Sequence, residues 1–155
     1  AEESEICQAI NSFPGSGRRF EKLAENLYSD YGHHPVEIQA TLQMAKELSS
    51  DVALVYQPHQ NVRQHEIIGQ YTDDIFRDAN EIYWLPTYLT RENPDLPTLT
   101  PQQLAKNIDK EKVHFAELDD SLWQEITAAR NSGKLVLCMG AGTIDGWIRE
   151  QLAKN

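Results

Sequence analysis

The sequence predicts an α/β fold, with an open, mostly parallel sheet, helices on both of its faces and an N-terminal β-hairpin. Short apolar runs of strand length alternate with helical patterns over most of the 155 residues. Runs that are apolar throughout indicate strands buried on both faces, which is typical of parallel sheets covered by helices. Ahead of this alternation, residues 18–26 and 27–31 indicate two strands joined by a tight turn.

Four later runs have the length and composition of buried strands. They are residues 51–56, 82–85, 113–115 and 134–139. The helical patterns cover residues 35–48, 64–78, 100–108, 121–131 and 144–154. This alternation predicts a Rossmann-like arrangement, in which ligands bind beyond the carboxyl ends of the strands. The proline-rich loop of residues 86–101 follows one of these strands and is expected at that edge.

Residues at the expected helix ends support three of the helices. Pro35 fits a first helical position, and Glu37 adds negative charge to the same turn, where the helix dipole favours it. The string from Thr100 to Gln103 resembles a capping box. Gly133 follows the helix of residues 121–131 and fits a C-terminal stop.

Composition and charge exclude several classes of protein. The chain has 14 Lys and Arg against 24 Asp and Glu, a net charge of −10. Nucleic acid and anionic membranes require a basic surface, so neither is an expected partner. No apolar run approaches the roughly 20 residues that span a bilayer, and the acidic start lacks the pattern of a signal peptide. A cytoplasmic location is therefore expected. Neither Cys7 nor Cys138 has metal-ligand spacing, and Cys138 fits a small buried residue.

The first candidate binding loop covers residues 29–35, between a strand and a helix N-terminus. Free backbone N–H groups at such a position attract anions, and His33 and His34 lie beside them. Asp30, at the strand end, has the chemistry to accept hydrogen bonds from ribose hydroxyls. The alternative is structural: Asp30 caps the turn and His34 packs beneath Pro35. The residue types leave both alternatives open.

The second candidate loop covers residues 57–65 and again follows a buried strand. Arg63 offers a planar group suited to a carboxylate or phosphate, and His59 lies close to it in the sequence. The alternative is a solvated loop with an arginine at a helix start. Because the helix dipole disfavours a cation there, the arginine indicates that an anion lies nearby.

Other patterns in the chain are weaker. Four histidines on these loops suggest a metal site, but no cysteine or carboxylate pair completes it with convincing spacing. Gly140 and Gly142 open the last helix, yet the third glycine of a dinucleotide-binding fingerprint is missing. They are therefore expected to form a close strand-to-helix turn that lines the same crevice. No phosphate loop of the Gly-Lys-Ser/Thr type occurs, so a triphosphate is not held here in that manner.

Four strings in this order and spacing resemble the muramyl (Mur) ligases. They are Arg18-Arg19-Phe20-Glu21, Asp30-Tyr31-Gly32-His33-His34-Pro35, Gln57-Pro58-His59 and Gly140-Ala141-Gly142. The resemblance implies that residues 13–155 are the C-terminal domain, which closes over the amino acid and ATP. Residues 1–12 are then the end of an interdomain linker, with a lead-in helix. A UDP-binding domain and a central ATPase domain, which carries the phosphate loop, are expected outside this chain.

The resemblance implies an enzyme of peptidoglycan synthesis that forms an amide at the expense of ATP and is inactive as an isolated domain. Its partners are UDP-N-acetylmuramate, L-alanine and ATP with Mg²⁺, the last two held mainly by the central domain. Arg19 and Asp30 are then expected to contact ATP. The amino acid is expected at His33, His59, Gln60 and Arg63. The expected crevice-lining residues are His34, Tyr88, Glu92, Gly140 and Gly142.

Three positions depart from the family's pattern. Ser29 stands where an aspartate is usual, and Gln60 and His65 stand where arginines are usual. Losing a charged ligand for a carboxylate costs roughly 1.5–3 kcal/mol of binding. Two alternatives to alanine ligation therefore stay open. One is the related ligase that recycles a whole peptide onto UDP-N-acetylmuramate, and the other is a binding module that kept the fold without catalysis.

Overall fold

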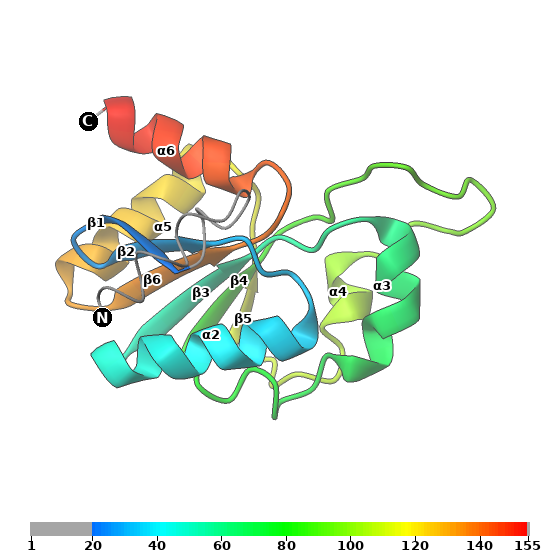
Figure 1. Ribbon diagram of the computed structural model, residues 1–155, viewed down its shortest axis with the longest axis horizontal. Coiled ribbons are helices and arrows are strands. Elements are labelled where there is room, and N and C mark those ends of the chain that lie inside the picture. The colour runs from blue at the N-terminus through cyan, green and yellow to red at the C-terminus, as the bar shows by residue number, and fades with distance from the viewer. Residues whose placement is uncertain (1–19, 155) are drawn as a thin grey trace, which may run out of the picture.

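One mixed sheet organises the computed structural model, which describes residues 20–154 (Figure 1). Within these residues the sheet has six strands in the order β1-β2-β6-β3-β4-β5. The strands are β1 (Glu21–Ala24), β2 (Leu27–Asp30), β3 (Val52–Tyr56), β4 (Glu81–Trp84), β5 (Val113–Phe115) and β6 (Leu135–Met139). β1 pairs antiparallel with β2, and every other neighbouring pair is parallel. The predicted parallel sheet with an N-terminal hairpin is confirmed.

Helices cover both faces of the sheet, as predicted (Figure 1). On one face lie α2 (Pro35–Leu48), α3 (Asn61–Ile67), the short 3₁₀ helix η1 (Ile68–Gln70) and α4 (Pro101–Leu104). On the other lie α5 (Asp120–Asn131) and α6 (Ile144–Lys154). No helix among residues 20–154 is long and apolar enough to cross a membrane.

Strict alternation of side chains divides the core into two clusters. Leu54 and Tyr56 of β3 pack toward α2, whereas Ala53 and Val55 pack toward α5 and α6. The side chains of β6 alternate in the same way, and both strands are buried along their whole length. Because successive side chains of a strand point to opposite faces, a strand covered on both sides must be apolar throughout.

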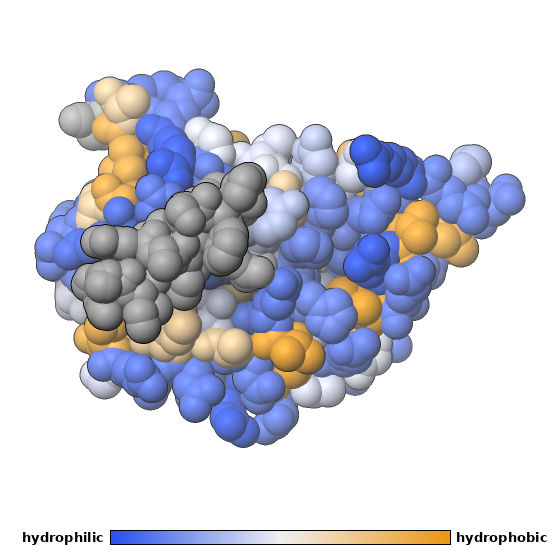
Figure 2. Space-filling view, viewed as in Figure 1, coloured by the Kyte–Doolittle hydropathy of each residue, from blue (hydrophilic) through white to orange (hydrophobic). Residues whose placement is uncertain are grey.

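Helix α2 has the bounds predicted for it, because its signals are local. Pro35 occupies its first turn, and the ring of His34 accepts from the backbone N–H of Val36 as the N-cap. The carboxylate of Glu37 in turn accepts the N–H of His34 at 3.1 Å. His34 therefore caps the helix instead of packing beneath Pro35. Figure 2 shows an apolar band along the solvent face of α2, where the exposed Val36, Met44 and Leu48 lie.

The helix predicted over residues 64–78 is wrong in both of its bounds. Helix α3 begins three residues earlier, at Asn61, and ends at Ile67. After η1 the chain leaves the helical path, and Tyr71 and Phe76 turn into the core. The helix predicted over residues 100–108 is likewise shorter, although its capping box at Thr100 is confirmed. The strand predicted over residues 18–26 is described only as β1, and residues 1–19 lie outside the described range.

The strand order creates a switch point between β3 and β6. The chain leaves β3 toward α3 on one face and leaves the adjacent β6 toward α6 on the other face. Two neighbouring connections that diverge in this way open a crevice at the carboxyl edge, where α/β proteins bind ligands. Gln57 follows β3 and Gly140 follows β6, so both lie at this crevice.

Candidate functional site

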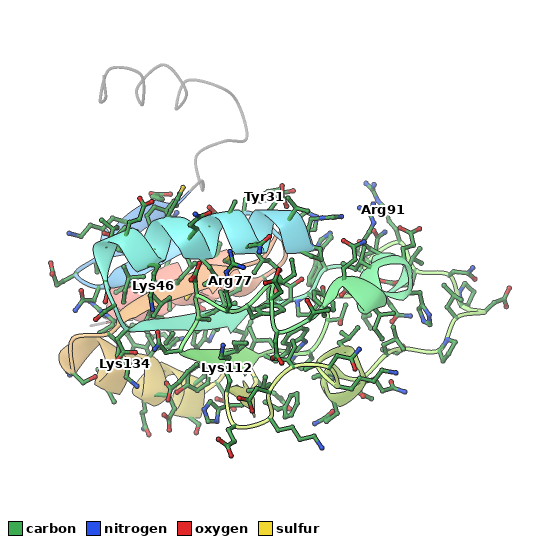
Figure 3. All side chains as sticks on the ribbon, turned by 90° about the horizontal axis from the view of Figure 1, so that it is seen from below. Tyr31, Lys46, Arg77, Arg91, Lys112 and Lys134 are labelled. Atoms are coloured by element: carbon green, nitrogen blue, oxygen red, sulfur yellow. The ribbon has the colours of Figure 1, made fainter. Side chains whose placement is uncertain are left out.

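The loops after β2, β3, β4 and β6 converge at the carboxyl edge of the sheet. Figure 3 shows Tyr31 and Arg91, from two of these loops, at the end toward which β3 and β4 point. Lys134, just ahead of β6, lies at the opposite end. The loop of residues 86–100 projects furthest at the carboxyl edge, beside α3 (Figure 1). Parallel strands thus bring together side chains that are far apart in the sequence.

Asp30 ends β2 with a side chain that is only 2% exposed. Its carboxylate accepts the backbone N–H of Phe20 at 2.8 Å and that of Gly32 at 2.7 Å. A Cβ at Gly32 would lie 2.9 Å from the nearer carboxylate oxygen, so the turn depends on glycine there. Asp30 therefore caps its own turn, which is the structural alternative raised by the sequence.

A row of rings crosses the site from loop to loop. The His33 ring lies 5.3 Å from the His59 ring, and the His59 ring stacks on Tyr88 at 5.5 Å and 18°. Tyr31 meets the His33 ring edge-on at 5.8 Å. Tyr88 is also joined to the second loop through its backbone, because its N–H donates to Pro58 O. The structure thus brings the rings of His33, His59 and Tyr88 together.

Gln60 has strained backbone geometry just before α3. Its φ of 70° and ψ of 112° are uncommon for a residue that has a side chain. Two backbone hydrogen bonds hold it: its N–H donates to Tyr88 O at 2.7 Å, and its carbonyl accepts from Gln64 at 3.1 Å. Strain of this kind clusters at functional loops and costs of order 1–3 kcal/mol. The position at which the resemblance expects an arginine is therefore held firmly in place.

Glu92 places a carboxylate at the start of α3. Its carboxylate accepts the backbone N–H groups of Asn61 at 2.9 Å, Val62 at 3.1 Å and Thr90 at 2.8 Å. Burial raises the pKa of Glu92, but these three donors outweigh burial and the net shift is downward. Arg63 extends from the same turn, exposed, with its Nε 3.4 Å from the carboxylate of Glu66.

Gln57 joins the two sides of the crevice. Its side-chain amide donates to Thr143 Oγ1 at 2.9 Å, and its side-chain oxygen accepts the N–H of Ile144 at 3.1 Å, at the start of α6. A Cβ at Gly142 would lie 2.6 Å from Tyr88 Cγ and 2.8 Å from the Gln57 side-chain oxygen. Gly140 has a φ of 156°, in the range that favours glycine. Both glycines thus serve the close turn predicted for them.

A pocket of about 550 Å³ opens on the α5 and α6 side of this crevice. Gln57, Tyr88 and Thr143 line it, together with Leu85, Pro86, Thr87, Leu89, Glu117 and Leu118. Its place outside the carboxyl ends of the strands is the one that α/β folds use for ligands. Sequence reasoning included Gln57 in the second candidate loop without giving it a role, and it did not assign Thr143 to a site. The signal available for Gln57 was a polar side chain directly after an apolar strand.

Ser29 faces a carboxylate across the sheet edge. The Ser29 hydroxyl donates to Asp145 Oδ1 at 2.7 Å, and Arg149 Nε donates to Asp145 Oδ2 at 2.9 Å. Arg149 also reaches Glu21 of β1 at 2.7 Å. Ser29 is 1% exposed, so an aspartate in its place would bring two carboxylates into contact out of water. Ser29, which stands where the family usually has an aspartate, therefore suits the neighbouring carboxylate of Asp145.

The His59 ring favours its neutral form. Burial lowers its pKa, the nearby His33 and Arg63 lower it further, and Glu92 opposes them. Among the described residues, its Nδ1 atom is buried without a hydrogen-bond partner. His65, the other histidine of this loop, is held differently, with its Nε2 at 2.8 Å from Pro97 O. The second position at which the resemblance expects an arginine therefore braces the loop of residues 86–100.

Most of the predicted site residues lie at this one edge of the sheet. His33, His59, Gln60, Tyr88 and Glu92 are joined by the ring contacts and backbone hydrogen bonds given above. Asp30 is joined to the turn after β6 through its backbone, because Gly140 N–H donates to Asp30 O at 3.2 Å. Arg19 lies outside the described residues.

Within residues 20–154 no three His, Cys, Asp or Glu side chains are placed to hold a metal ion. The four histidines are spread along the edge: His34 caps α2, His65 holds Pro97 O, and His33 and His59 face each other. Cys138 is buried in β6, where burial raises its pKa to about 12, and so it is a packing residue.

The fold and the candidate site define an α/β domain with a crevice at the switch point of its sheet. A family model described as "Mur ligase, glutamate ligase domain" matches residues 18–142. The chain belongs to this family of Mur ligase C-terminal domains. The resemblance drawn from the four sequence strings is confirmed.

Curated relatives agree with this assignment, and solved structures share the fold. The UDP-N-acetylmuramate–L-alanine ligase of Rickettsia massiliae is 36% identical over 158 residues, which cover 94% of this chain and 32% of that protein. The chain thus spans about a third of the length of the curated relatives it matches. Among structures, UDP-N-acetylmuramate-alanine ligase MurC of Thermotoga maritima has a TM-score of 0.65 at 23% identity, over 99% of this chain and 33% of that one. A murein peptide ligase of Psychrobacter arcticus has a TM-score of 0.55 at 19% identity, over 95% and 32%. These two structures share the fold.

Proposed function

We propose that this chain is the amino-acid-binding and ATP-closing domain of a ligase that joins L-alanine to UDP-N-acetylmuramate in peptidoglycan synthesis. The convergence of His33, His59, Gln60 and Arg63 from two loops at one crevice carries the proposal. The name of the Rickettsia relative supports the choice of substrates. In this reaction the muramate carboxylate attacks the γ-phosphorus of ATP, which releases ADP and forms an acyl phosphate. The amine of alanine then attacks the acyl carbon, phosphate leaves, and the nitrogen loses its proton.

Arg63 is assigned the carboxylate of the amino acid. Its side chain extends from the first turn of α3, is 46% exposed and has a single ion pair, through Nε, among the described contacts. A guanidinium has five N–H donors, so most of its capacity to bind a carboxylate stays available. The carboxylate of Glu92 occupies the backbone donors at this helix end. The ligand's carboxylate is therefore expected at the side chain of Arg63 and not at the backbone.

The imidazoles of His33 and His59 are assigned the region around the amine. Because the pKa of His59 is lowered, its ring is neutral at neutral pH and does not repel an incoming ammonium group. The ring of Tyr88 stacks on His59 and fixes its plane. An amino acid bound between these rings and Arg63 would place its amine beside the imidazoles and its carboxylate beside the guanidinium.

ATP is assigned to Asp30, for the ribose hydroxyls, and to Arg19, for the phosphates. Asp30 fits this role because it lies at a strand end and its orientation is fixed by two backbone donors. For Mg²⁺ the described residues do not fit, because they include no cluster of metal ligands. The metal ion and most phosphate contacts are therefore assigned to the remainder of the complete protein. On this proposal the domain is inactive alone.

Ligation of a whole peptide is the second candidate function. Gln60 favours it, because a neutral amide replaces the charged ligand expected for a single amino acid's carboxylate. His65 favours it as well, because its ring is engaged with Pro97 O and does not face a ligand as a second arginine would. A peptide has its carboxylate far from the reacting amine and needs fewer cations beside that amine.

Phosphate release by the complete protein, with ATP, Mg²⁺ and UDP-N-acetylmuramate present, tests the proposal. Each amino acid and a short peptide that begins with L-alanine are added in turn. Stimulation by L-alanine supports the proposal, and stimulation by the peptide alone supports the second candidate. No stimulation by any of them rejects both and favours a non-catalytic binding module.

An Arg63→Ala variant tests the assigned carboxylate contact. We expect the KM for the amino acid to rise roughly tenfold or more, as for loss of a charge-assisted hydrogen bond, with the KM for ATP little changed. Arg77→Ala is the matched control, because Arg77 is also exposed and paired with an acid three residues away. Equal increases in both KM values for Arg63→Ala would contradict the assignment.

A further inference from the structure

Three fully buried polar side chains connect the two candidate loops from beneath. Tyr56 ends β3, Gln64 lies on the inner face of α3, and Tyr71 follows η1. Each of the three is 0% exposed. They lie in the aromatic cluster of Phe76 and Trp84, where polar groups are costly unless they are hydrogen bonded.

The hydrogen bonds of this buried chain run from one loop to the other. The Tyr56 hydroxyl reaches His33 O at 2.9 Å and the Tyr71 hydroxyl at 2.6 Å. The Tyr71 hydroxyl donates to the Gln64 side-chain oxygen at 2.6 Å, and the Gln64 amide donates to His59 O at 3.0 Å. The chain therefore ends on the backbone carbonyls of the two histidines whose rings face each other at 5.3 Å.

The buried chain has fewer hydroxyl hydrogens than oxygen–oxygen contacts. Two phenol hydrogens serve three oxygen–oxygen contacts: His33 O to Tyr56, Tyr56 to Tyr71, and Tyr71 to Gln64. Burial raises the pKa of both phenols, so neither supplies a charged acceptor. Two hydrogens cannot fill three contacts, so at any moment one contact lacks its hydrogen. The chain thus joins the two loops through contacts that share two phenol hydrogens.

We propose that Tyr56, Tyr71 and Gln64 are positioning residues that set the spacing of His33 and His59 for the amino acid. This inference rests on the proposed ligase function. None of the three touches the crevice, so they act through the two backbones. Replacing a tyrosine by phenylalanine keeps most of the buried apolar area and removes only the hydroxyl. Beyond packing, the two hydroxyls contribute the hydrogen bonds that link the two loops.

Nucleotide binding is expected to be independent of this chain. Among the described contacts, Asp30, the assigned ribose ligand, is held by Phe20 N–H, Gly32 N–H and the backbone of Gly140, none of which belongs to the chain. A break in the chain therefore separates the KM for the amino acid from the KM for ATP. A purely structural role would change both values together or neither.

The test compares Tyr71→Phe with Tyr83→Phe in the complete enzyme, with whichever amino acid the wild type uses. Tyr83 is the matched control, since its ring stacks on His114 at the far side of the sheet. We expect Tyr71→Phe to raise the KM for the amino acid about fivefold to tenfold, the effect of losing one hydrogen bond, and to leave the KM for ATP within about twofold. Tyr83→Phe should change neither.

A double variant makes the test sharper. Gln64→Met breaks the same chain at its next contact, so Tyr71→Phe and Gln64→Met together should raise the KM little more than either alone. Independent, multiplying effects would overturn the inference. An unchanged amino-acid KM in Tyr71→Phe, or an equal rise in the KM for ATP, would also overturn it.

These outcomes are distinguishable from failure of the proposed function. If the wild type uses an amino acid other than alanine, the assigned substrate fails while the same comparison, made with that amino acid, decides the positioning role. If the wild type ligates no amino acid or peptide at all, the function and the inference fall together.

Discussion

The carboxylate of Glu92 lies 2.9 Å from the backbone nitrogen of Asn61, the first residue of α3, although 31 residues separate them. Asn61 also contacts this loop through its own side chain, which donates to Pro97 O at 3.0 Å and accepts the N–H of Leu99 at 2.9 Å. The projecting loop of residues 86–100 and the start of α3 therefore hold each other in place. Because α3 carries Arg63, the geometry of the candidate amino-acid site depends on this loop.

Glu92→Ala should lower the free energy of unfolding by about 1 kcal/mol, as for loss of an N-cap residue. The reason is that Asn61 and Val62 lose the acceptor of their backbone N–H groups. Urea unfolding of the 155-residue chain measures the change. Asp95→Ala, in the same exposed loop, is the control and should be neutral. Equal stabilities of the two variants would show that Glu92 does not cap α3.

Gly142→Ala and Gly146→Ala should shift stability in opposite directions. A methyl group at Gly142 would lie 2.6 Å from the Tyr88 ring, so we expect a loss of about 1–3 kcal/mol from overpacking. At Gly146, on the exposed face of α6, nothing lies within 4 Å, so the better helix former should add about 0.5–1 kcal/mol. Thermal unfolding of both variants measures the pair. A stabilised Gly142→Ala would mean that the turn is looser than described.

Ser29→Asp, which restores the family's usual residue, should destabilise this chain. Its carboxylate would meet the partly buried carboxylate of Asp145, at a cost of about 1–3 kcal/mol. Ser29→Ala should cost less, because it leaves no second charge. Exchanging the two residues, as Ser29→Asp with Asp145→Ser, should restore part of the loss in chemical unfolding. If Ser29→Asp alone is neutral, Asp145 does not explain the departure.

The pH dependence of stability should include a contribution from His59. Its folded-state pKa is lowered, so as the pH falls below about 6.5 the unfolded chain takes up this proton first. The free energy of unfolding therefore falls through this window, until the pH lies below the folded-state pKa. Urea midpoints measured between about pH 7.5 and pH 5.5 should decline less steeply in His59→Gln. Identical slopes in the two proteins would exclude this contribution.

Local signals explain why part of the fold was predictable. Helix α2 runs from Pro35 to Leu48 as predicted, because its cap, its first proline and its apolar spacing lie within a few residues of one another. The strands β3 and β6 were predictable because a strand covered on both faces must be apolar at every position. The convergence of His33 and His59 followed from parallel strands that end at one edge.

Tertiary contacts decided the rest. Helix α3 begins at Asn61 because the carboxylate of Glu92, from another loop, accepts its backbone N–H. No sequence pattern around Asn61 predicts this acceptor. The switch point exists because β6 pairs between β2 and β3. The sequence of a strand does not specify which strands it pairs with. Tyr56, Gln64 and Tyr71 resemble ordinary residues in the chain and become a link between loops only when packing brings them together.

The sequence by itself thus determined the class of fold, the family and the edge of the sheet that carries the candidate site, since periodicity, caps and short motifs depend on neighbouring residues. Only the tertiary structure decided what each polar group contacts. Asp30 accepts the N–H groups of Phe20 and Gly32, Ser29 pairs with Asp145, and Glu92 caps α3. The physical reason is that most of these hydrogen bonds join residues 10 to 116 positions apart, and such pairs meet only once the sheet has formed.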